Sequence, residues 1–301
     1  MAGHHSQSTP GSAQTDLALA RNLQRRRLAA REYGLGVAER QEQKAAVFQA
    51  LHAGEPFVIP NPWDAGSARV LEALGFKALA STSSGFAFTL GRLDGNVTLD
   101  EVVAHAALLD SCTELPVSVD LENGYGADPE DAARAVTRIA EAGAVGASIE
   151  DYDPAGRIYD VDHAVERVTA AVEAARALGF AFMLTARAEN HIRGNPDLAD
   201  TISRLQAFER AGADVLYAPG LRTVDEIRTV CAAVGRPVNV LAWPDLALTE
   251  VFDAGAQRVS VGGSLTWVAV AAMADAANAI REGGNFSALG VKPPIDAWLA
   301  T

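Results

Sequence analysis

A short apolar strand followed by a helix is the unit that recurs along this chain, eight times between residues 57 and 282. The expected strands are apolar along their whole length, which is typical of parallel strands that are covered on both faces. Many of the expected helices end in a glycine signal such as Leu74-Gly75 or Leu178-Gly179, which closes the helix before the next strand begins. Eight such units predict an α/β protein of the (β/α)8 TIM barrel class.

A doubly wound open sheet is the alternative for alternating strands and helices. The strand count and the absence of a Gly-x-Gly-x-x-Gly turn after the first expected strand count against it. The expected strands cover residues 57–61, 77–83, 117–122, 147–150, 182–188, 215–218, 238–242 and 258–262, and the expected helices cover 64–74, 99–112, 129–142, 161–178, 198–211, 224–234, 247–254 and 265–282. A glycine-rich loop is expected between the second strand and residue 99.

The chain is expected to divide into three parts. Residues 1–15 are small and polar and are expected to be disordered, residues 16–54 to form N-terminal helices, and residues 55–301 to form the catalytic barrel. The first N-terminal helix, expected over 16–33, is rich in arginine. We interpret it as an extension that packs on the barrel or on a neighbouring subunit, with a transit peptide as the alternative.

The charge of the chain limits its partners. A net charge of −13 argues against nucleic acid and against anionic membranes as partners. We find no apolar run long enough to span a bilayer and no signal-peptide core, so a cytoplasmic enzyme is the expectation.

Acidic side chains occur where the expected strands end. Asp120 and Glu122 close the third strand, and because residues i and i+2 of a strand share a face, both carboxylates can point the same way. Two like charges that close repel each other unless a cation lies between them, and Mg²⁺ prefers oxygen ligands of this kind. Asp94 follows the second strand and Glu150 closes the fourth, so the pattern recurs at three successive strand ends.

Polar and basic residues belong to the same end of the expected barrel, where the active sites of this fold lie. Because charged residues are rarely buried unless they are paired, a metal and an anion-binding arginine explain this set better than core packing does. These residues are Thr82, Ser83 and Ser84 after the second strand, and Arg187, Glu189 and His191 after the fifth. A structural ion-pair network of Arg187 with Glu150 or Glu189 is the alternative.

Over residues 56–284 the chain resembles the isocitrate lyase and phosphoenolpyruvate mutase superfamily. The resemblance rests on the combination of several short motifs, none of which is specific alone. The motifs are Asn61-Pro62-Trp63-Asp64-Ala65, Thr82-Ser83-Ser84, Leu90-Gly91-Arg92-Leu93-Asp94, Asp120-Leu121-Glu122-Asn123-Gly124-Tyr125-Gly126, Ser148-Ile149-Glu150-Asp151, Thr185-Ala186-Arg187-Ala188-Glu189, Ala211-Gly212-Ala213-Asp214 and Arg258-Val259-Ser260-Val261-Gly262.

The resemblance implies a metal site. Asp120 is implied as the direct ligand of Mg²⁺, or of Mn²⁺ in its place, with Asp94, Glu122 and Glu150 holding the waters of the metal. It also implies a TIM barrel whose C-terminal helix is exchanged between neighbouring subunits, and hence a homodimer or homotetramer.

The resemblance implies a substrate site as well. Arg187 is implied to clamp a substrate carboxylate, while the Thr82-Ser83-Ser84 segment holds the carboxylate and the 2-oxo group. A 2-oxo carboxylate chelates Mg²⁺, which stabilises the enolate that forms when the bond at C3 is broken or made.

One loop departs from the superfamily. The lyases carry Lys-Lys-Cys-Gly-His after the fourth strand, whereas residues 151–160 here contain neither Cys nor His, and they also lack the Lys and Asn of the mutases. The catalytic candidates on this loop are Tyr152, Arg157 and Tyr159, of which we expect Tyr152 to be a solvated loop residue. His191 is a further candidate proton donor, with a structural hydrogen-bonding role as its alternative.

Three functions follow from this pattern. The first is a Mg²⁺-dependent lyase that cleaves or forms a C–C bond in a small 2-oxo or 2-hydroxy (di)carboxylate, for example by decarboxylating oxaloacetate, with Arg187 and Glu150 in catalytic roles. The second is a P–C bond enzyme of the phosphonopyruvate mutase or hydrolase type, which needs a phosphoryl-binding cation. The third is a barrel that binds a keto acid and a metal without turnover.

Overall fold

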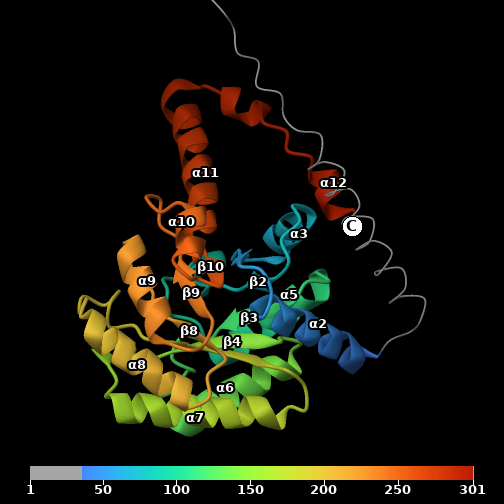
Figure 1. The fold of residues 1–301 in the computed structure, drawn as a ribbon. Coiled ribbons are helices and arrows are strands. Elements are labelled where there is room, and N and C mark those ends of the chain that lie inside the picture. The colour runs from blue at the N-terminus through green and yellow to red at the C-terminus, as the bar shows by residue number, and fades with distance from the viewer. Residues whose placement is uncertain (1–35, 301) are drawn as a thin grey trace, which may run out of the picture.

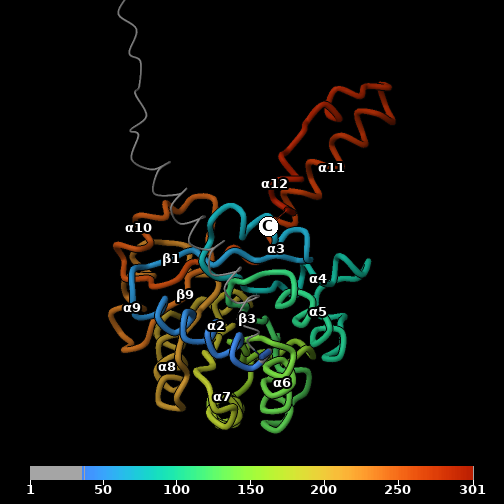
Figure 2. The backbone as a smooth tube through the Cα atoms, turned by 90° about the vertical axis from the view of Figure 1, so that its right-hand side faces the viewer, coloured from blue at the N-terminus to red at the C-terminus, as the bar shows by residue number. Residues whose placement is uncertain are grey.

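Eight parallel strands form a nearly closed barrel with helices outside it in the computed structural model, which describes residues 36–300 (Figures 1 and 2). Neighbouring strands follow the order β1-β10-β9-β8-β7-β4-β3-β2. The strands are β1 (Phe57–Ile59), β2 (Leu79–Ala80), β3 (Val117–Asp120), β4 (Gly146–Glu150), β7 (Met183–Arg187), β8 (Val215–Tyr217), β9 (Val238–Leu241) and β10 (Arg258–Ser260). The predicted (β/α)8 class is therefore confirmed.

The helices between the strands follow the predicted order. Four of these eight helices begin at a residue whose side chain caps the first turn. Thr98 Oγ1, for example, accepts from the Glu101 N–H at 3.3 Å, and Glu101 Oε2 accepts from the Thr98 N–H at 2.8 Å. These helices are α3 (Ala65–Ala73), α5 (Leu99–Cys112), α6 (Pro129–Glu141), α7 (Val161–Ala177), α8 (Leu198–Arg210), α9 (Val224–Ala233), α10 (Leu248–Asp253) and α11 (Ser264–Gly283).

Asn61 joins the barrel at the seam between β1 and β2, the two ends of the strand order. Its Nδ2 donates to the Ser81 carbonyl at 3.0 Å, and its Oδ1 accepts from the backbone N–H groups of Val261 and Gly262, both at 2.9 Å. One backbone bond, from Ala80 N–H to the Pro60 carbonyl at 3.1 Å, also crosses the seam. The Asn61 side chain thus ties the end of β1 to the ends of both neighbouring strands, β2 and β10.

Helix α2 (Val37–His52) covers the opposite end of the barrel. Phe48 is fully buried there, in a cluster with residues at the strand starts that includes Phe57, Met183 and Val215. The fit is tight, because a Cβ added to Gly146 would lie 2.8 Å from Phe48 Cε1. The helix expected over 16–33 and the disorder expected over 1–15 lie outside the described residues.

Two segments differ from the predicted elements. The second strand is only two residues long, and the expected glycine-rich loop begins with helix α4 (Ser83–Thr89), capped by Thr82, whose Oγ1 accepts from the Gly85 N–H at 3.4 Å. The loop after the fourth strand contains a small antiparallel hairpin, formed by β5 (Tyr152–Asp153) and β6 (Arg157–Ile158). Both segments lie at the carboxyl end of the barrel, above the strands.

Helix α11 projects away from the barrel, as both views show (Figures 1 and 2). Of its residues only Thr266 is buried. The 3₁₀ helix η1 (Ser287–Gly290) follows, and α12 (Ile295–Leu299) then packs on α3, where Arg69 Nη2 donates to the Leu299 carbonyl at 2.8 Å. Across residues 36–300, no helix combines the length and the apolar character that crossing a membrane requires.

Candidate active site

A polar cavity of about 170 Å³ opens among the carboxyl ends of the strands. Residues from most of the strands and from the loops after them contribute to its wall. Six of the sequence-predicted site residues line it: Thr82, Ser83, Ser84, Asp94, Asp120 and Arg187. The structure therefore brings together residues that are more than 100 positions apart in the chain.

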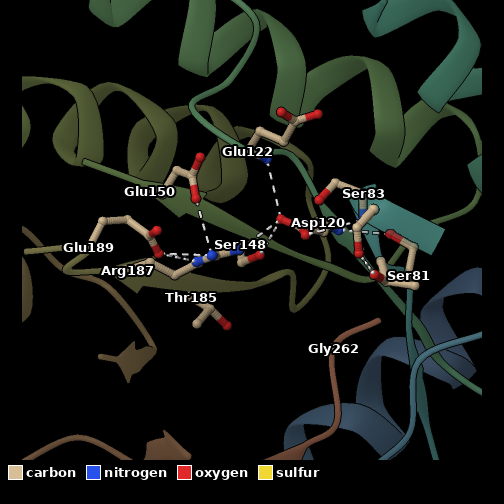
Figure 3. A network of polar contacts seen from close by, with 12 residues as sticks. Ser81, Ser83, Asp120, Glu122, Ser148, Glu150, Thr185, Arg187, Glu189 and Gly262 are labelled. Atoms are coloured by element: carbon tan, nitrogen blue, oxygen red, sulfur yellow. Dashed lines mark hydrogen bonds and ion pairs between the residues drawn. The ribbon is translucent and has the colours of Figure 1, made fainter. Parts of the chain in front are cut away.

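Arg187, the last residue of β7, lies among three carboxylates (Figure 3). Its Nη1 lies 3.0 Å from Asp120 Oδ1, and its Nη2 lies 3.1 Å from Glu150 Oε2 and 2.8 Å from Glu189 Oε1. Burial disfavours the charged guanidinium, but the carboxylates outweigh it, Glu189 first, and hold the pKa of Arg187 well above its usual value. The ion pairs considered as an alternative for Arg187 are thus formed, and they involve a residue that also lines the cavity.

Asp120 is held by neighbours on adjacent strands. Its Oδ1 also accepts from Ser148 Oγ and from the Glu122 N–H, both at 3.3 Å, whereas its Oδ2 accepts a single long bond of 3.4 Å from the Ser83 N–H. The Asp120 N–H donates to Ser81 Oγ at 2.9 Å. Because a carboxylate oxygen has more than one acceptor site, Oδ2 keeps unused acceptor capacity at the cavity.

Glu122 does not share the direction of Asp120. Strand β3 ends at Asp120, and Glu122 takes a left-handed backbone conformation with φ +48°, so the strand argument for a common direction does not apply to it. Figure 3 shows its side chain directed away from the Asp120 oxygens. There its Oε1 accepts from the Tyr125 hydroxyl at 3.1 Å.

The acidic groups around Asp120 repel one another. Burial, and then the charges of Asp120 and Asp94, raise the pKa of Glu122 to about 7. Burial also raises the pKa of Asp94, with a smaller contribution from Asp120. Glu150 is almost completely buried, which raises its pKa well above the usual value despite the Arg187 guanidinium. Burial is the largest cause of each of these shifts, and in each case a neighbouring carboxylate adds to it, so the ionised forms of these groups are disfavoured beside the cavity.

This donor set fits a hydrated divalent cation. Within residues 36–300, no group of three or more His, Cys, Asp or Glu side chains is close enough to hold a metal ion by itself. Mg²⁺ does not need such a cage, because it is usually bound by one or two carboxylates and keeps several waters. The free acceptor capacity of Asp120 and the repulsion among Asp94, Asp120 and Glu122 are what such an ion would satisfy.

Tyr159 and His191 lie outside the cavity that contains Arg187. The Tyr159 hydroxyl lies 3.4 Å from Asn123 Nδ2, in a second hollow that Glu122 also lines. His191 is buried, with Nε2 3.7 Å from Glu226 Oε1 and Nδ1 within 3.5 Å of a threonine hydroxyl. The structure does not bring either of these two candidates to the cluster around Asp120.

The remaining loop candidates contact other groups. Arg157 is exposed and pairs with Asp153 on its own hairpin at 3.0 Å. The Tyr152 ring lies 3.9 Å from the guanidinium carbon of Arg193. No residue of the hairpin is among those that line the cavity.

Tyr217 is a cavity residue that the sequence reasoning missed. Its ring lies 5.2 Å from the guanidinium carbon of Arg187, and burial raises its pKa to about 12, which keeps the phenol protonated at neutral pH. Tyr217 ends β8, so its strand-end position was the available signal, but an aromatic residue in an apolar strand is normally a core residue.

Residues 48–281 match the model of the family described as phosphoenolpyruvate phosphomutase. The oxaloacetate decarboxylase of Paraburkholderia xenovorans (strain LB400) is 30% identical over 80% of this chain and 83% of its own length. A structure from Burkholderia cenocepacia J2315, described only as a lyase/mutase, is 49% identical with a TM-score of 0.84 over 87% of this chain and 97% of that chain. The structure of oxaloacetate acetylhydrolase with its product oxalate is 26% identical with a TM-score of 0.76 over 85% and 92% of the two chains.

Proposed function

The chain belongs to the phosphoenolpyruvate phosphomutase family, and from this premise we propose that it is a Mg²⁺-dependent lyase which breaks a C–C bond in a small 2-oxo dicarboxylate. Decarboxylation of oxaloacetate is the specific reaction proposed. The observation that carries this choice is the composition of the cavity wall, which combines Arg187, Asp94 and Asp120 with the Thr82-Ser83-Ser84 segment.

The hairpin after β4 supports decarboxylation over other C–C cleavages. Cleavage of a 2-hydroxy acid needs a base to remove the hydroxyl proton. Decarboxylation needs no such base, because loss of CO₂ leaves its electron pair on the remaining fragment. Since no side chain of residues 151–160 lines the cavity, a reaction without a loop acid or base fits this chain best.

Arg187 and the 82–84 segment are proposed to hold the substrate. Arg187 Nη1 donates to Asp120 in this structure, so a substrate carboxylate at the same nitrogen would replace Asp120 there. Because Nε and Nη2 of Arg187 donate to Glu189, the substrate carboxylate is proposed to accept one charge-assisted hydrogen bond from Nη1. Thr82, Ser83 and Ser84 line the facing wall, where hydroxyl and N–H groups can bind the 2-oxo oxygen.

Asp120 is proposed as the metal ligand, and Asp94, Glu122 and Glu150 are proposed to bind its waters. Of these three, Asp94 shares the cavity wall with Asp120. When bound, Mg²⁺ supplies positive charge at the 2-oxo group, where negative charge develops as the C3–C4 bond breaks. The electron pair of that bond moves toward the C2 oxygen, CO₂ leaves, and C3 later takes up a proton. Tyr217, which is protonated at neutral pH, is the candidate donor on the cavity wall, with solvent as the other source.

Pyruvate formation from oxaloacetate under multiple-turnover conditions tests this proposal. Because divalent ions also promote the reaction without protein, the rate with the same Mg²⁺ concentration alone is subtracted. We expect turnover that EDTA abolishes and that Asp120→Asn, a variant of nearly the same shape without the charge, lowers at least 100-fold. Phosphonopyruvate is assayed in parallel as the substrate of the P–C bond alternative.

Two results of these assays would contradict the proposed reaction. Turnover of phosphonopyruvate but not of oxaloacetate would overturn the C–C assignment. Binding of 2-oxo acids without turnover of any of them would identify a keto-acid-binding barrel instead of an enzyme.

A further inference from the structure

Two arginines and two glutamates beside the cavity form a closed ring of ion pairs, here called the quartet and consisting of Glu150, Arg187, Glu189 and Arg193. Glu150 Oε2 lies 3.1 Å from Arg187 Nη2, while its Oε1 lies 3.9 Å from Arg193 Nη2. Glu189 Oε1 lies 2.8 Å from Arg187 Nη2, while its Oε2 lies 3.2 Å from Arg193 Nε. Each glutamate therefore gives one oxygen to each arginine.

The two arginines of the quartet lie at different positions relative to the cavity. Arg187 lines the cavity, whereas Arg193 lies outside the cavity wall and its side chain is 40% exposed. Glu150 and Glu189 are buried side chains with 8% and 1% exposure. A buried carboxylate that is held at one oxygen only can rotate, so the second arginine fixes the direction in which the first oxygen faces Arg187.

The quartet is also joined to the hairpin after β4. The guanidinium of Arg193 lies over the ring of Tyr152, at 3.9 Å from the ring centroid, which is within the range of a cation–π interaction. A hydrogen bond also links the quartet to the base of the hairpin, where the Glu189 N–H donates to Asp151 Oδ1 at 2.8 Å. The position of the hairpin and the position of Arg193 therefore depend on each other.

We propose that Arg193 is a positioning residue for Arg187, and that its stack on Tyr152 couples the hairpin to the anion-binding site. Arg193 acts through Glu150 and Glu189 and does not contact the substrate. The inference rests on the proposed function in one respect, namely that Arg187 binds an anionic substrate. The coupling to the hairpin does not depend on that function.

The charge of Arg193 and its stacking on Tyr152 make separate contributions, which substitutions can distinguish. Loss of Arg193 removes a cation that Glu150 and Glu189 share with Arg187, so both side chains then face Arg187 alone and its capacity to bind an anion falls. Lysine at position 193 restores the charge, but an ammonium group lacks the flat face that stacks on a ring and the fork that binds two carboxylates. Leucine at position 152 removes the ring and leaves the charges in place.

The experiment combines two measurements on Arg193→Ala, Arg193→Lys, Tyr152→Leu and Tyr152→Phe. The affinity for oxalate at saturating Mg²⁺ is measured by calorimetry, and amide hydrogen exchange of the hairpin, residues 152–158, is measured without ligand. Arg222→Ala is the matched control, because Arg222 also stacks on an aromatic ring, that of Trp243 at 3.4 Å, but is not part of the quartet.

We expect Arg193→Ala to weaken oxalate binding tenfold or more and to accelerate exchange in the hairpin. Arg193→Lys should recover most of the affinity but little of the hairpin protection. Tyr152→Leu should lose the hairpin protection and also weaken oxalate binding, by less than Arg193→Ala does, because the stack that holds Arg193 in place is gone. Tyr152→Phe, which keeps the ring, and Arg222→Ala should match the wild type in both measurements. In a turnover assay, Arg193→Ala should raise KM for the substrate more than it lowers kcat, because the loss concerns substrate orientation at Arg187.

Unchanged oxalate affinity and unchanged hairpin exchange in Arg193→Ala would overturn the proposal. If Arg193→Ala does not fold, as judged by circular dichroism, Arg193→Lys and Tyr152→Leu still decide it, because both keep the balance of charges. Failure of the wild type to bind oxalate would count against the proposed function, whereas the exchange measurement would still test the link between Tyr152 and Arg193.

Discussion

The amide of Asn61 shows how much of the barrel depends on a single side chain. Asn61 is buried, and its three hydrogen bonds satisfy backbone groups of Ser81, which follows β2, and of Val261 and Gly262, which follow β10. Ser81 in turn accepts from the Asp120 N–H through its Oγ. Two hydrogen bonds, both through Ser81, thus connect Asn61 to the candidate metal ligand Asp120.

Asn61→Ala is expected to lower the free energy of unfolding by about 3 kcal/mol, because it leaves one backbone group of buried Ser81 and two of half-buried Val261 and Gly262 without their partner. Each such group costs about 1–3 kcal/mol, partly offset by relaxation. Urea unfolding followed by circular dichroism measures the loss. Asn195→Ala, at an exposed loop position, is the matched control and should change the free energy of unfolding by less than about 0.5 kcal/mol. A loss below about 1 kcal/mol for Asn61→Ala would show that the seam does not depend on this amide.

Residues at strand ends were predictable, because in a barrel of parallel strands all carboxyl ends meet at one face. Asp120 and Arg187 were found in this way, although they are distant in sequence. Glu122 was assigned the direction of Asp120 because the strand was expected to continue to residue 122, and its left-handed φ of +48° could not be inferred from a glutamate in the sequence.

Helix α11 is the element that the barrel of a single chain leaves most exposed. Trp267 is 45% exposed, Val268 66% and Met273 61%, although all three are apolar. The helix projects away from the barrel instead of packing on it (Figures 1 and 2). Exposed apolar side chains grouped on one element indicate a surface that another protein covers.

We predict that a second copy of the chain covers α11, so that the protein forms a dimer or a larger even-numbered assembly. The double substitution Val268→Glu with Met273→Glu should convert it to a smaller species at micromolar concentration, as measured by sedimentation velocity. Asn278→Glu adds a charge to an exposed polar position of the same helix and should leave the assembly unchanged. A wild-type protein that sediments as a monomer at this concentration would contradict the prediction.

The elements that the sequence did not predict are short. Strands β5 and β6 have two residues each, and α4 has seven, so none of the three reaches the length at which a hydrophobic period becomes visible. Thr82 was a usable helix-start signal, but the glycine at position 85 favoured a loop. The longer helices were predicted because their capping residues and apolar periods agree with the fold.

For the molecule as a whole, two buried neutral histidines limit stability in acid. His52 Nδ1 donates to the Phe48 carbonyl at 2.8 Å, which leaves Nε2 to accept from Arg258 Nη1 at 3.1 Å. Burial, and then the charge of Arg258, lower the pKa of His52 to about 3. His105 stacks on Phe86 with ring centroids 4.0 Å apart, and burial lowers its pKa to about 4.

Both shifts predict a loss of stability as the pH falls below the ordinary histidine pKa of 6.5. Below this pH each histidine is protonated in the unfolded chain but stays neutral in the folded chain. The loss of stability grows until the pH reaches the folded-state pKa of that histidine. At pH 5 it amounts to about 2 kcal/mol for each histidine.

His52→Gln should therefore flatten the dependence of the unfolding free energy on pH between about 6.5 and 3, as measured by urea unfolding at a series of pH values. Asp151, whose pKa burial raises to about 6, acts in the opposite sense, so the difference between variant and wild type isolates the histidine. Parallel pH profiles of the two proteins would contradict this prediction.

Calorimetric titration of oxalate, a mimic of the pyruvate enolate, shows whether Asp120 and Arg187 form one site for a divalent cation and a 2-oxo acid. We expect binding that requires Mg²⁺, is lost in EDTA, and is lost in both Asp120→Ala and Arg187→Ala. Oxalate that binds equally well in EDTA, or that does not bind the wild type at all, would contradict this expectation.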